Sequence, residues 1–377
     1  MNILQISFHT APMNSLGVND GGGLNVYVES ISRELAKDNI VHIITGEQAK
    51  NMSKKNLKLS SFNLFTNQAN TEEKKEFLYE FIEKTFQYIE EHEIDVVHAH
   101  YWLSGLVAKE IKQRYKIPFI FTSHSLGVFI QENGLDRISA EKEIFNSADK
   151  ITASSQFEKE NLLNRYGADK LKIHIVTPGL NEKTFKAFRG EKRKNIILSV
   201  GRIQKQKGQL QTLDLFKNLQ YRIKGLELIF VGGPSGADGE AYLTKMKNKI
   251  EELRIEDEVQ FVGSLSQKKL VKLMRKSKLL IHSAESETFG LVAIEAHRSG
   301  LPVLSTNQGS FKEIISNNED GLVSKSFEDV QVYDFIIKLF ENEECIIAVF
   351  FVSKEVNVGE AFCQKSNSGK RPRLPPR

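Results

Sequence analysis

Two carboxylates flank a turn in the second half of the chain, the first at Glu287 and the second eight residues later at Glu295. Between them, Phe289-Gly290-Leu291 leaves a polar loop and enters a helical pattern that stops near Gly300. A loop that enters a helix presents free backbone N–H groups and the positive end of the helix dipole, which suits a phosphate. Carboxylates at its rim can accept hydrogen bonds from sugar hydroxyls. Taken alone, a surface carboxylate and a helix-capping one are an equal alternative.

Two loops earlier in the chain carry groups that suit an anion. Residues 201–208 read Gly-Arg-Ile-Gln-Lys-Gln-Lys-Gly, where Arg202 and Lys207 could hold a diphosphate by charge-assisted hydrogen bonds. Residues 20–28 read Asp-Gly-Gly-Gly-Leu-Asn-Val-Tyr-Val, whose glycine amides could approach an anion at a helix start. The contiguous glycines lack the G-x-G-x-x-G spacing of a dinucleotide site. A solvated basic loop and a flexible glycine loop remain the alternatives.

Histidines follow two apolar runs, at His98 and His100 and again at His124. At the carboxyl end of a strand in an α/β sheet, an imidazole can serve a ligand site or be a hydrogen-bonded structural group. No third ligand with zinc-type spacing accompanies them, so we predict no metal site.

Length and composition limit the class of protein. The chain has 377 residues, 40% hydrophobic and 27% charged, which fits a soluble protein of two domains. A net charge of +4 from scattered residues is too weak to indicate nucleic acid, but is compatible with anionic small molecules or a membrane surface. The two cysteines, Cys345 and Cys363, indicate no disulfide framework, so we expect a cytoplasmic protein. No apolar run is long enough for a membrane span, so any membrane contact would be peripheral.

Strand and helix patterns alternate along the chain, which predicts an α/β fold of two doubly wound parallel-sheet domains facing a cleft. The first domain, 1–180, has strand patterns at 3–6, 41–45, 95–100, 118–122 and 150–154 and helix patterns at 26–37 and 71–91. A polar stretch, 47–70, precedes the second helix. The second domain, 181–344, has strand patterns at 196–200, 226–231, 259–262 and 279–282 and helix patterns at 209–218, 242–254 and 267–277.

The ordered motifs resemble the retaining glycosyltransferases of family 4, which have the two-Rossmann GT-B architecture. The glycine loop, the loop with Arg202 and Lys207, and the E-x7-E element match in order, and the resemblance runs from about residue 2 to 325. Residues 9–12, 22–28, 98–105 and 232–236 resemble the D-inositol 3-phosphate glycosyltransferase branch. Residues 124–127 and 137–141 resemble the sucrose-phosphate synthase branch, so the acceptor stays open.

The resemblance implies a role for individual residues. Arg202 and Lys207 would hold the donor diphosphate, Glu287 the sugar hydroxyls, and His124 would lie beside the anomeric centre. Further donor-side positions are Gly22, Gly23, Val262, which would face the base, Phe289, Gly290, Leu291, and Glu295, which would bind the ribose. Acceptor-side positions are Asn25, Tyr101, Ser125 and Arg137, the last suited to a phosphate.

The activity implied is metal-independent transfer of a hexosyl unit from a nucleotide-diphosphate sugar, expected to be UDP-linked, with no cofactor. The acceptor would be a sugar, a sugar phosphate, a polysaccharide or a lipid-linked molecule, with a small phosphorylated acceptor favoured by Arg137 and Tyr101. A nucleotide-sugar epimerase on the same fold and a degenerate protein that only binds nucleotide sugars are the alternatives. Nothing in the sequence indicates a nucleic-acid partner or an oligomeric state.

The chain departs from the family pattern at two places. Residues 307–310, Asn-Gln-Gly-Ser, keep one glycine where the family has two, so the backbone there could approach phosphates less closely. Residues 345–377 replace the amphipathic helices expected at the end, and they resemble frame-shifted, foreign or disordered sequence. Loss of a helix that crosses back onto the first domain would loosen domain closure, and the apolar run 345–352 favours aggregation.

Overall fold

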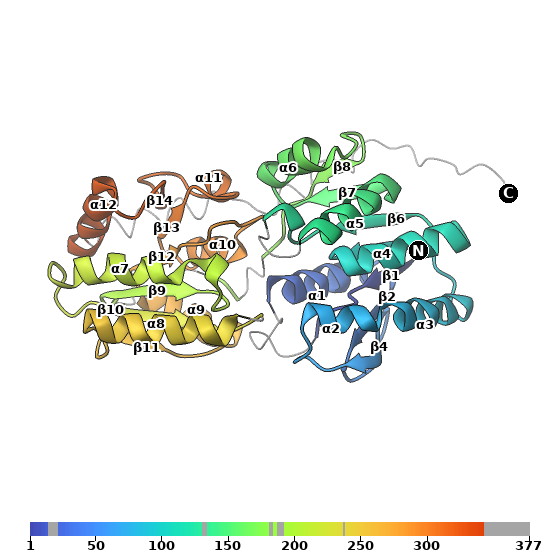
Figure 1. Ribbon diagram of the computed structural model, residues 1–377, viewed down its shortest axis with the longest axis horizontal. Helices are drawn as coiled ribbons and strands as arrows, with labels where there is room; N and C mark the ends of the chain where they lie inside the picture. The colour runs from blue at the N-terminus through green and yellow to red at the C-terminus, as the bar shows by residue number, and fades with distance from the viewer. Residues whose placement is uncertain (14–21, 130–133, 181–183, 187–191, 237, 343–377) are drawn as a thin grey trace.

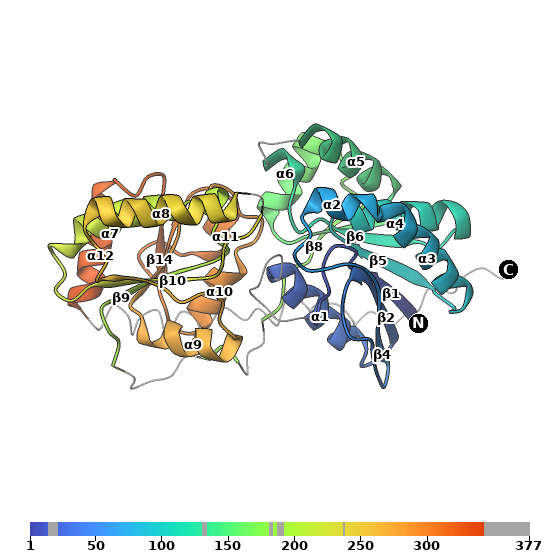
Figure 2. The same ribbon diagram turned by 60° about the horizontal axis from the view of Figure 1, so that its bottom comes forward.

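The computed structural model describes residues 1–13, 22–129, 134–180, 184–186, 192–236 and 238–342. They form two α/β units, each with a sheet between layers of helices (Figures 1 and 2). In the second unit, adjacent strand residues Ile196 and Ile197 belong to separate apolar clusters, one on each face of the sheet. Because both faces are buried, the strands read as continuous apolar runs.

Within the described residues, the first sheet has eight strands in the order β3-β4-β2-β1-β5-β6-β7-β8. All neighbouring pairs are parallel except β3 and β4. The strands are β1 Asn2–Ile6, β2 Ile40–Glu47, β3 Met52–Lys54, β4 Leu57–Phe65, β5 Val96–His100, β6 Phe119–Thr122, β7 Lys150–Ala153 and β8 Ile173–Ile175. The helical segments are α1 Gly23–Leu35, α2 Thr71–Glu76, α3 Leu78–Glu90, α4 Trp102–Tyr115, η1 Gly127–Phe129, α5 Gly134–Ser147 and α6 Gln156–Tyr166.

The second sheet is parallel throughout, in the order β11-β10-β9-β12-β13-β14. Its strands are β9 Ile196–Val200, β10 Glu227–Val231, β11 Val259–Phe261, β12 Leu279–His282, β13 Val303–Thr306 and β14 Gly321–Ser324. Its helical segments are η2 Lys205–Lys207, α7 Gln209–Gln220, α8 Gly239–Leu253, α9 Gln267–Lys276, α10 Leu291–Arg298, α11 Phe311–Ile314 and α12 Val330–Glu341. The order reverses beside β9, so the loops after β9 and β12 meet at a switch point where ligands bind in such folds.

The predicted fold class is confirmed, and two local features differ from the pattern. The polar stretch 47–70 contains β3 and β4, because Leu57, Leu59 and other alternate residues of β4 point into the core. The helix pattern 71–91 is divided into α2 and α3. Phe77 caps both helices with φ −91° and ψ 0°, and its ring packs 6.0 Å from that of Phe65.

The chain passes from the first sheet to the second between β8 and β9. The predicted division at residues 180 and 181 falls in this connection. The atypical segment 345–377 lies outside the described residues, so its predicted character stays a prediction. Among the described helices, none combines the length and the apolar character that crossing a membrane requires.

Candidate functional site

Two helices begin next to each other at the carboxyl edges of the two sheets. Helix α1 starts after Gly22 and α10 starts after Gly290, and neither has a side chain that caps its first amides. A Cβ atom placed on Gly23 would lie 3.3 Å from Leu291 Cδ1. Two uncapped helix N-termini from different units therefore converge, and their amides and dipoles favour an anion between them.

A half-buried ion pair stands beside this point. Lys207 Nζ, at the end of η2, lies 2.8 Å from Glu287 Oε2 in the loop after β12. Burial opposes ionisation of Glu287, but the charge of Lys207, with smaller contributions from His282 and a backbone N–H, lowers its pKa to about 2. Glu287 is thus a carboxylate at neutral pH, held against the cation that the sequence predicts for a diphosphate.

Glu295, one turn into α10, has the opposite electrostatic character. Burial raises the pKa of its carboxyl to about 8, and no described residue forms an ion pair or hydrogen bond with that group. The pKa values of the two carboxyls in the E-x7-E element therefore differ widely. Glu287 is charged and paired, whereas Glu295 is neutral at pH 7 and has unused hydrogen-bonding capacity. Such a divided pair is typical of a ligand site.

Close backbone packing fixes the loop that carries Glu287. Gly309 has φ +101°, and a Cβ there would lie 2.2 Å from the Glu287 carbonyl oxygen. Gly208 has φ +63°, and a Cβ there would lie 2.1 Å from the Ser283 carbonyl oxygen. Both positions require glycine. The one glycine retained in residues 307–310 is thus the one that lets the loop after β13 pack against Glu287.

Arg202 and Val262 occupy other carboxyl ends of the second sheet. Arg202 and Lys207 lie in the same loop after β9. The Arg202 carbonyl accepts a hydrogen bond from Gln209 Nε2 at 2.8 Å. Val262 follows the edge strand β11 and is 38% exposed, which is unusual for a valine beside a buried sheet. The edge location leaves an apolar surface available to a flat ligand group.

His124 lies after β6 in a left-handed backbone conformation, with φ +59°. Its Nε2 is 3.0 Å from Nδ1 of His100, and the Tyr27 ring meets it edge-on at 5.0 Å. Burial, with contributions from His98 and His9, lowers the pKa of His124 to about 3, so the ring is neutral at pH 7. A non-glycine residue held in this conformation is costly, and such residues cluster at functional sites.

Three of the predicted acceptor-side residues form one cluster. The Arg137 guanidinium donates to Tyr101 Oη at 3.3 Å and to Ser125 Oγ at 3.0 Å, and it lies 4.8 Å above the Tyr101 ring. Its Nε donates to the buried Glu141 carboxylate at 2.7 Å, which balances the charge. Glu141 also accepts from the Gly127 amide at 2.9 Å and so holds the loop after β6.

Asn25 lies apart from that cluster and supports the loop beside it. Its amide accepts from Thr10 Oγ1 at 2.9 Å and donates to the Ala11 carbonyl at 3.2 Å. His9, the residue before Thr10, stacks on Tyr101 with ring centroids 4.4 Å apart. Asn25 therefore fixes the wall of the cluster through the backbone of residues 9–11.

The two units meet through the E-x7-E loop. Thr288 Oγ1 donates to the His124 carbonyl at 3.2 Å, and the Thr288 carbonyl accepts from Ser155 Oγ at 2.7 Å. Glu158, buried in the first unit, accepts from the hydroxyls of Ser123 and Ser154 on both sides of this contact. We call these residues, together with Glu313 below, the interdomain junction. The sequence offers no local signal for Thr288, because its partners lie more than 130 residues away.

Glu313 provides a second contact of the junction that sequence reasoning missed. Its two carboxylate oxygens accept from the backbone amides of Gln156 and Phe157, at 2.8 and 2.7 Å, so a residue of α11 caps helix α6 of the other unit. Both figures place these helices side by side (Figures 1 and 2). A carboxylate at a helix N-terminus is favoured by the helix dipole.

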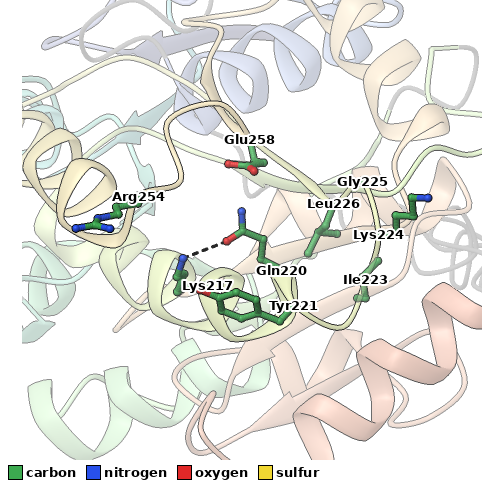
Figure 3. A pocket seen from close by; sticks show the side chains of 9 residues that line it. All are labelled: Lys217, Gln220, Tyr221, Ile223, Lys224, Gly225, Leu226, Arg254 and Glu258. Atoms are coloured by element: carbon green, nitrogen blue, oxygen red, sulfur yellow. Dashed lines mark hydrogen bonds between the residues drawn. The ribbon is translucent and has the colours of Figure 1, made fainter.

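A hollow of about 570 Å³ lies at the opposite edge of the second sheet (Figure 3). Lys217, Tyr221, Lys224 and Arg254 line it, next to the amino ends of β10 and β11. Ligands of doubly wound sheets bind at carboxyl ends, so this hollow is a poor candidate for the main site. The described residues contain no group of three or more His, Cys, Asp or Glu side chains placed to hold a metal ion.

Comparison with known proteins assigns both halves of the chain to glycosyltransferase families. The model "Glycosyltransferase Family 4" matches residues 21–184, and "Glycosyl transferases group 1" matches residues 181–346. A D-inositol 3-phosphate glycosyltransferase of Frankia alni is 30% identical, covering 88% of this chain and 89% of that protein. A protein of the same name from Nocardia farcinica is 31% identical, covering 86% of this chain and 78% of that protein.

Two solved glycosyltransferase-fold structures resemble this chain over nearly its whole length. The sucrose-phosphate synthase from Thermosynechococcus elongatus matches with a TM-score of 0.79 and 23% identity, over 96% of this chain and 98% of that one. Anabaena HepE in complex with UDP and glucose matches with a TM-score of 0.75 and 16% identity, over 96% and 98% of the two chains. These likenesses support the two-unit architecture.

Replacing Glu313 with alanine tests the junction. Because the carboxylate caps α6 from the other unit, its loss is expected to cost about 1 kcal/mol locally. Amide hydrogen exchange at Gln156 and Phe157 should then accelerate roughly fivefold. Glu319→Ala, which removes an exposed carboxylate from the same unit, serves as the control. Unchanged exchange at both amides in Glu313→Ala would show that the cap does not form in solution.

Proposed function

The chain belongs to the family 4 glycosyltransferases and has their GT-B architecture. We propose that it is a retaining enzyme. In this proposal it moves a hexosyl unit from a UDP-linked sugar to a hydroxyl of a small phosphorylated acceptor. The observation that carries the donor class is the convergence of the α1 and α10 N-termini beside Lys207 and Glu287. An anion site next to a paired carboxylate suits a ligand that joins a diphosphate to hydroxyl groups.

The donor is held mainly by the second unit in this proposal. Lys207 and Arg202 bind the diphosphate together with amides of Phe289, Gly290 and Leu291, and the Gly22 and Gly23 amides of α1 complete the anion site. Glu295 accepts hydrogen bonds from the ribose, and Val262 packs on the base. Glu287 accepts from hydroxyls of the sugar. The UDP named in the HepE structures supports uracil as the base.

The acceptor lies against the first unit. Arg137, Tyr101 and Ser125 present a guanidinium and two hydroxyls in one cluster, which suits a phosphate even though Glu141 balances part of the charge. Asn25 holds the neighbouring loop. The relatives named for D-inositol 3-phosphate support a phosphorylated polyol as the acceptor.

The reaction is a displacement on one face of the donor sugar. The bond between the anomeric carbon and the diphosphate oxygen breaks, the acceptor oxygen bonds to that carbon from the same side, and the acceptor proton passes to the departing phosphate oxygen. Lys207, Arg202 and the helix amides stabilise the charge that grows on the diphosphate. Each such donor is worth about 2.7 to 4 kcal/mol in comparable sites. Neutral His124 lies beside the positive charge that develops on the sugar without repelling it.

A donor and acceptor screen tests the proposal. UDP-, GDP- and ADP-glucose are each incubated with the protein, with and without D-inositol 3-phosphate, and products are followed by NMR. The proposal predicts that UDP release depends on the acceptor and that the product keeps the donor's anomeric configuration. An inverted product would contradict retention, conversion of the sugar without acceptor would identify an epimerase, and donor binding with no turnover on any acceptor would identify a binding protein.

Two alanine substitutions test the donor contacts. Lys207→Ala removes a cation from the departing diphosphate, and Glu295→Ala removes the ribose acceptor, so kcat/KM should fall at least 100-fold in the first and about 10-fold in the second. Lys205→Ala, in the same turn as Lys207, and Glu319→Ala are matched controls that should keep full activity. Circular dichroism should confirm that every variant is folded. Normal turnover in the folded Lys207→Ala protein would contradict the assignment.

The pH dependence of UDP affinity tests the role of Glu295. Its pKa of about 8 means that the carboxyl of the free protein is mostly neutral at pH 7 and mostly ionised at pH 9. Since the ionised form is the stronger acceptor for ribose hydroxyls, affinity measured by calorimetry should rise with pH through this range, by up to roughly tenfold. In Glu295→Gln the affinity should not change between pH 7 and 9. A flat profile in the unmodified protein would contradict the role.

A further inference from the structure

Gln5 is a polar residue between two apolar residues of strand β1. Its neighbours in β1, Leu4 and Ile6, are fully buried, and Gln5 itself has no exposed surface. Its Nε2 has no hydrogen-bond partner among the described residues, which costs about 1–3 kcal/mol for a buried donor. A residue that lowers stability in this way is expected to serve another purpose.

The other end of the Gln5 amide begins a hydrogen-bonded chain that leads to His124. Gln5 Oε1 lies 2.5 Å from Nε2 of His100, at the end of β5, and His100 Nδ1 lies 3.0 Å from Nε2 of His124. Both nitrogens of His100 are used. Strand pairing explains the proximity, because β1 adjoins β5, which adjoins β6 and the loop that carries His124.

The chain of contacts determines where the protons lie. The structure orients the Gln5 amide with its carbonyl oxygen toward His100. In this orientation the oxygen can only accept, so His100 donates through Nε2–H. Burial, with contributions from His98 and His124, lowers the pKa of His100 well below its usual value, so the ring is neutral and its Nδ1 can only accept. His124 must then donate through Nε2–H. Its remaining nitrogen, Nδ1, carries a lone pair and bonds to no described residue.

We propose that Gln5 and His100 are positioning residues that fix the orientation and the tautomer of His124, so that its Nδ1 is an acceptor for a hydroxyl of the donor sugar. The inference rests on the proposed function, in which His124 lies beside the sugar. It adds a specificity element, because a sugar with a hydroxyl at that position is bound and an analogue lacking it leaves Nδ1 unpaired.

The side chains packed around this hydrogen-bonded chain hold the His100 and His124 rings in place. His98 lies 4.1 Å from the His100 ring but is bound through Nε2 to Thr122 Oγ1 at 2.8 Å, so it is not part of the chain. Tyr27 meets the rings of both His100 and His124 edge-on. The titratable groups that face His100 are therefore His98, His124 and Tyr27. All three are neutral at pH 7, since burial lowers the pKa of His98 to about 4 and raises that of Tyr27 to about 12.

NMR of the histidine ring nitrogens tests the tautomer without any substrate. In protein labelled with ¹⁵N-histidine, the proposal predicts that His124 carries its proton on Nε2 in the unmodified chain. Gln5→Met has similar volume but only a weak acceptor in its thioether, so His124 should become a mixture of both tautomers. An Nδ1–H tautomer in the unmodified protein, or a single unchanged tautomer in Gln5→Met, would overturn the proposal. Because no turnover is measured, this result is independent of the proposed function.

Gln5→Glu gives a kinetic test with a distinct signature. A carboxylate beside His100 favours the imidazolium, which then donates through Nδ1 and forces His124 into the opposite tautomer. The kcat/KM of Gln5→Glu for the donor should therefore fall about 10- to 100-fold as pH drops below the new His100 pKa, whereas the unmodified protein shows no such acid limb above pH 5. A profile in Gln5→Glu that matches the unmodified protein would contradict the proposal.

A matched pair of variants separates positioning from general stability. His100→Gln interrupts the hydrogen-bonded chain from Gln5 to His124. His42→Gln removes another buried imidazole of the same sheet, whose Nδ1 lies 2.8 Å from Tyr88 Oη. The proposal predicts a loss of kcat in His100→Gln and none in His42→Gln at a similar loss of thermal stability. Equal kcat in the two variants would mean that the hydrogen-bonded chain only supports the core. If no variant and no unmodified protein turns over any donor, the proposed function fails while the NMR result still stands.

Discussion

The pairing of Lys207 with Glu287 is the interaction on which the rest of the site depends. It joins the loop after β9 to the loop after β12, and these are the two loops that flank the switch point of the second sheet. A half-buried carboxylate needs a cation nearby to stay ionised, and a cation that is proposed to bind a diphosphate needs a fixed position. Each group supplies what the other requires. Gly208 and Gly309 allow this arrangement because a side chain at either position would collide with the backbone of the Glu287 loop.

The same loop also carries the contact between the two units. The residue after Glu287 is Thr288, which bonds the His124 carbonyl through its hydroxyl and the Ser155 hydroxyl through its carbonyl. Glu287 and the loop that carries His124 are thus linked through the residue between them, Thr288. Any movement between the units changes the distance between the groups proposed to hold the diphosphate and the sugar. Glu313 adds a charged cap at the edge of this junction, so the contact between the units depends on electrostatics as well as on packing.

Sequence patterns could predict the parts of this arrangement that depend on local physics. Continuous apolar runs located the buried parallel strands, and the Phe-Gly-Leu turn located the start of α10. Long-range pairing left no local trace: the Glu313 cap and the Thr288 contact each depend on where distant segments meet. The positive φ angles of Tyr101 and His124 arise from tertiary contacts and not from residue type. Gln5 was the exception, since a polar residue inside an apolar strand could have been recognised as a signal.

The most direct test of the account is where a bound donor lies. A crystal structure with UDP-glucose should show the diphosphate between the N-termini of α1 and α10, within hydrogen-bonding distance of Lys207, with the ribose at Glu295 and the sugar between Glu287 and His124. A diphosphate bound elsewhere, for example in the basic hollow at Lys217 and Arg254, would contradict the assignment of the site.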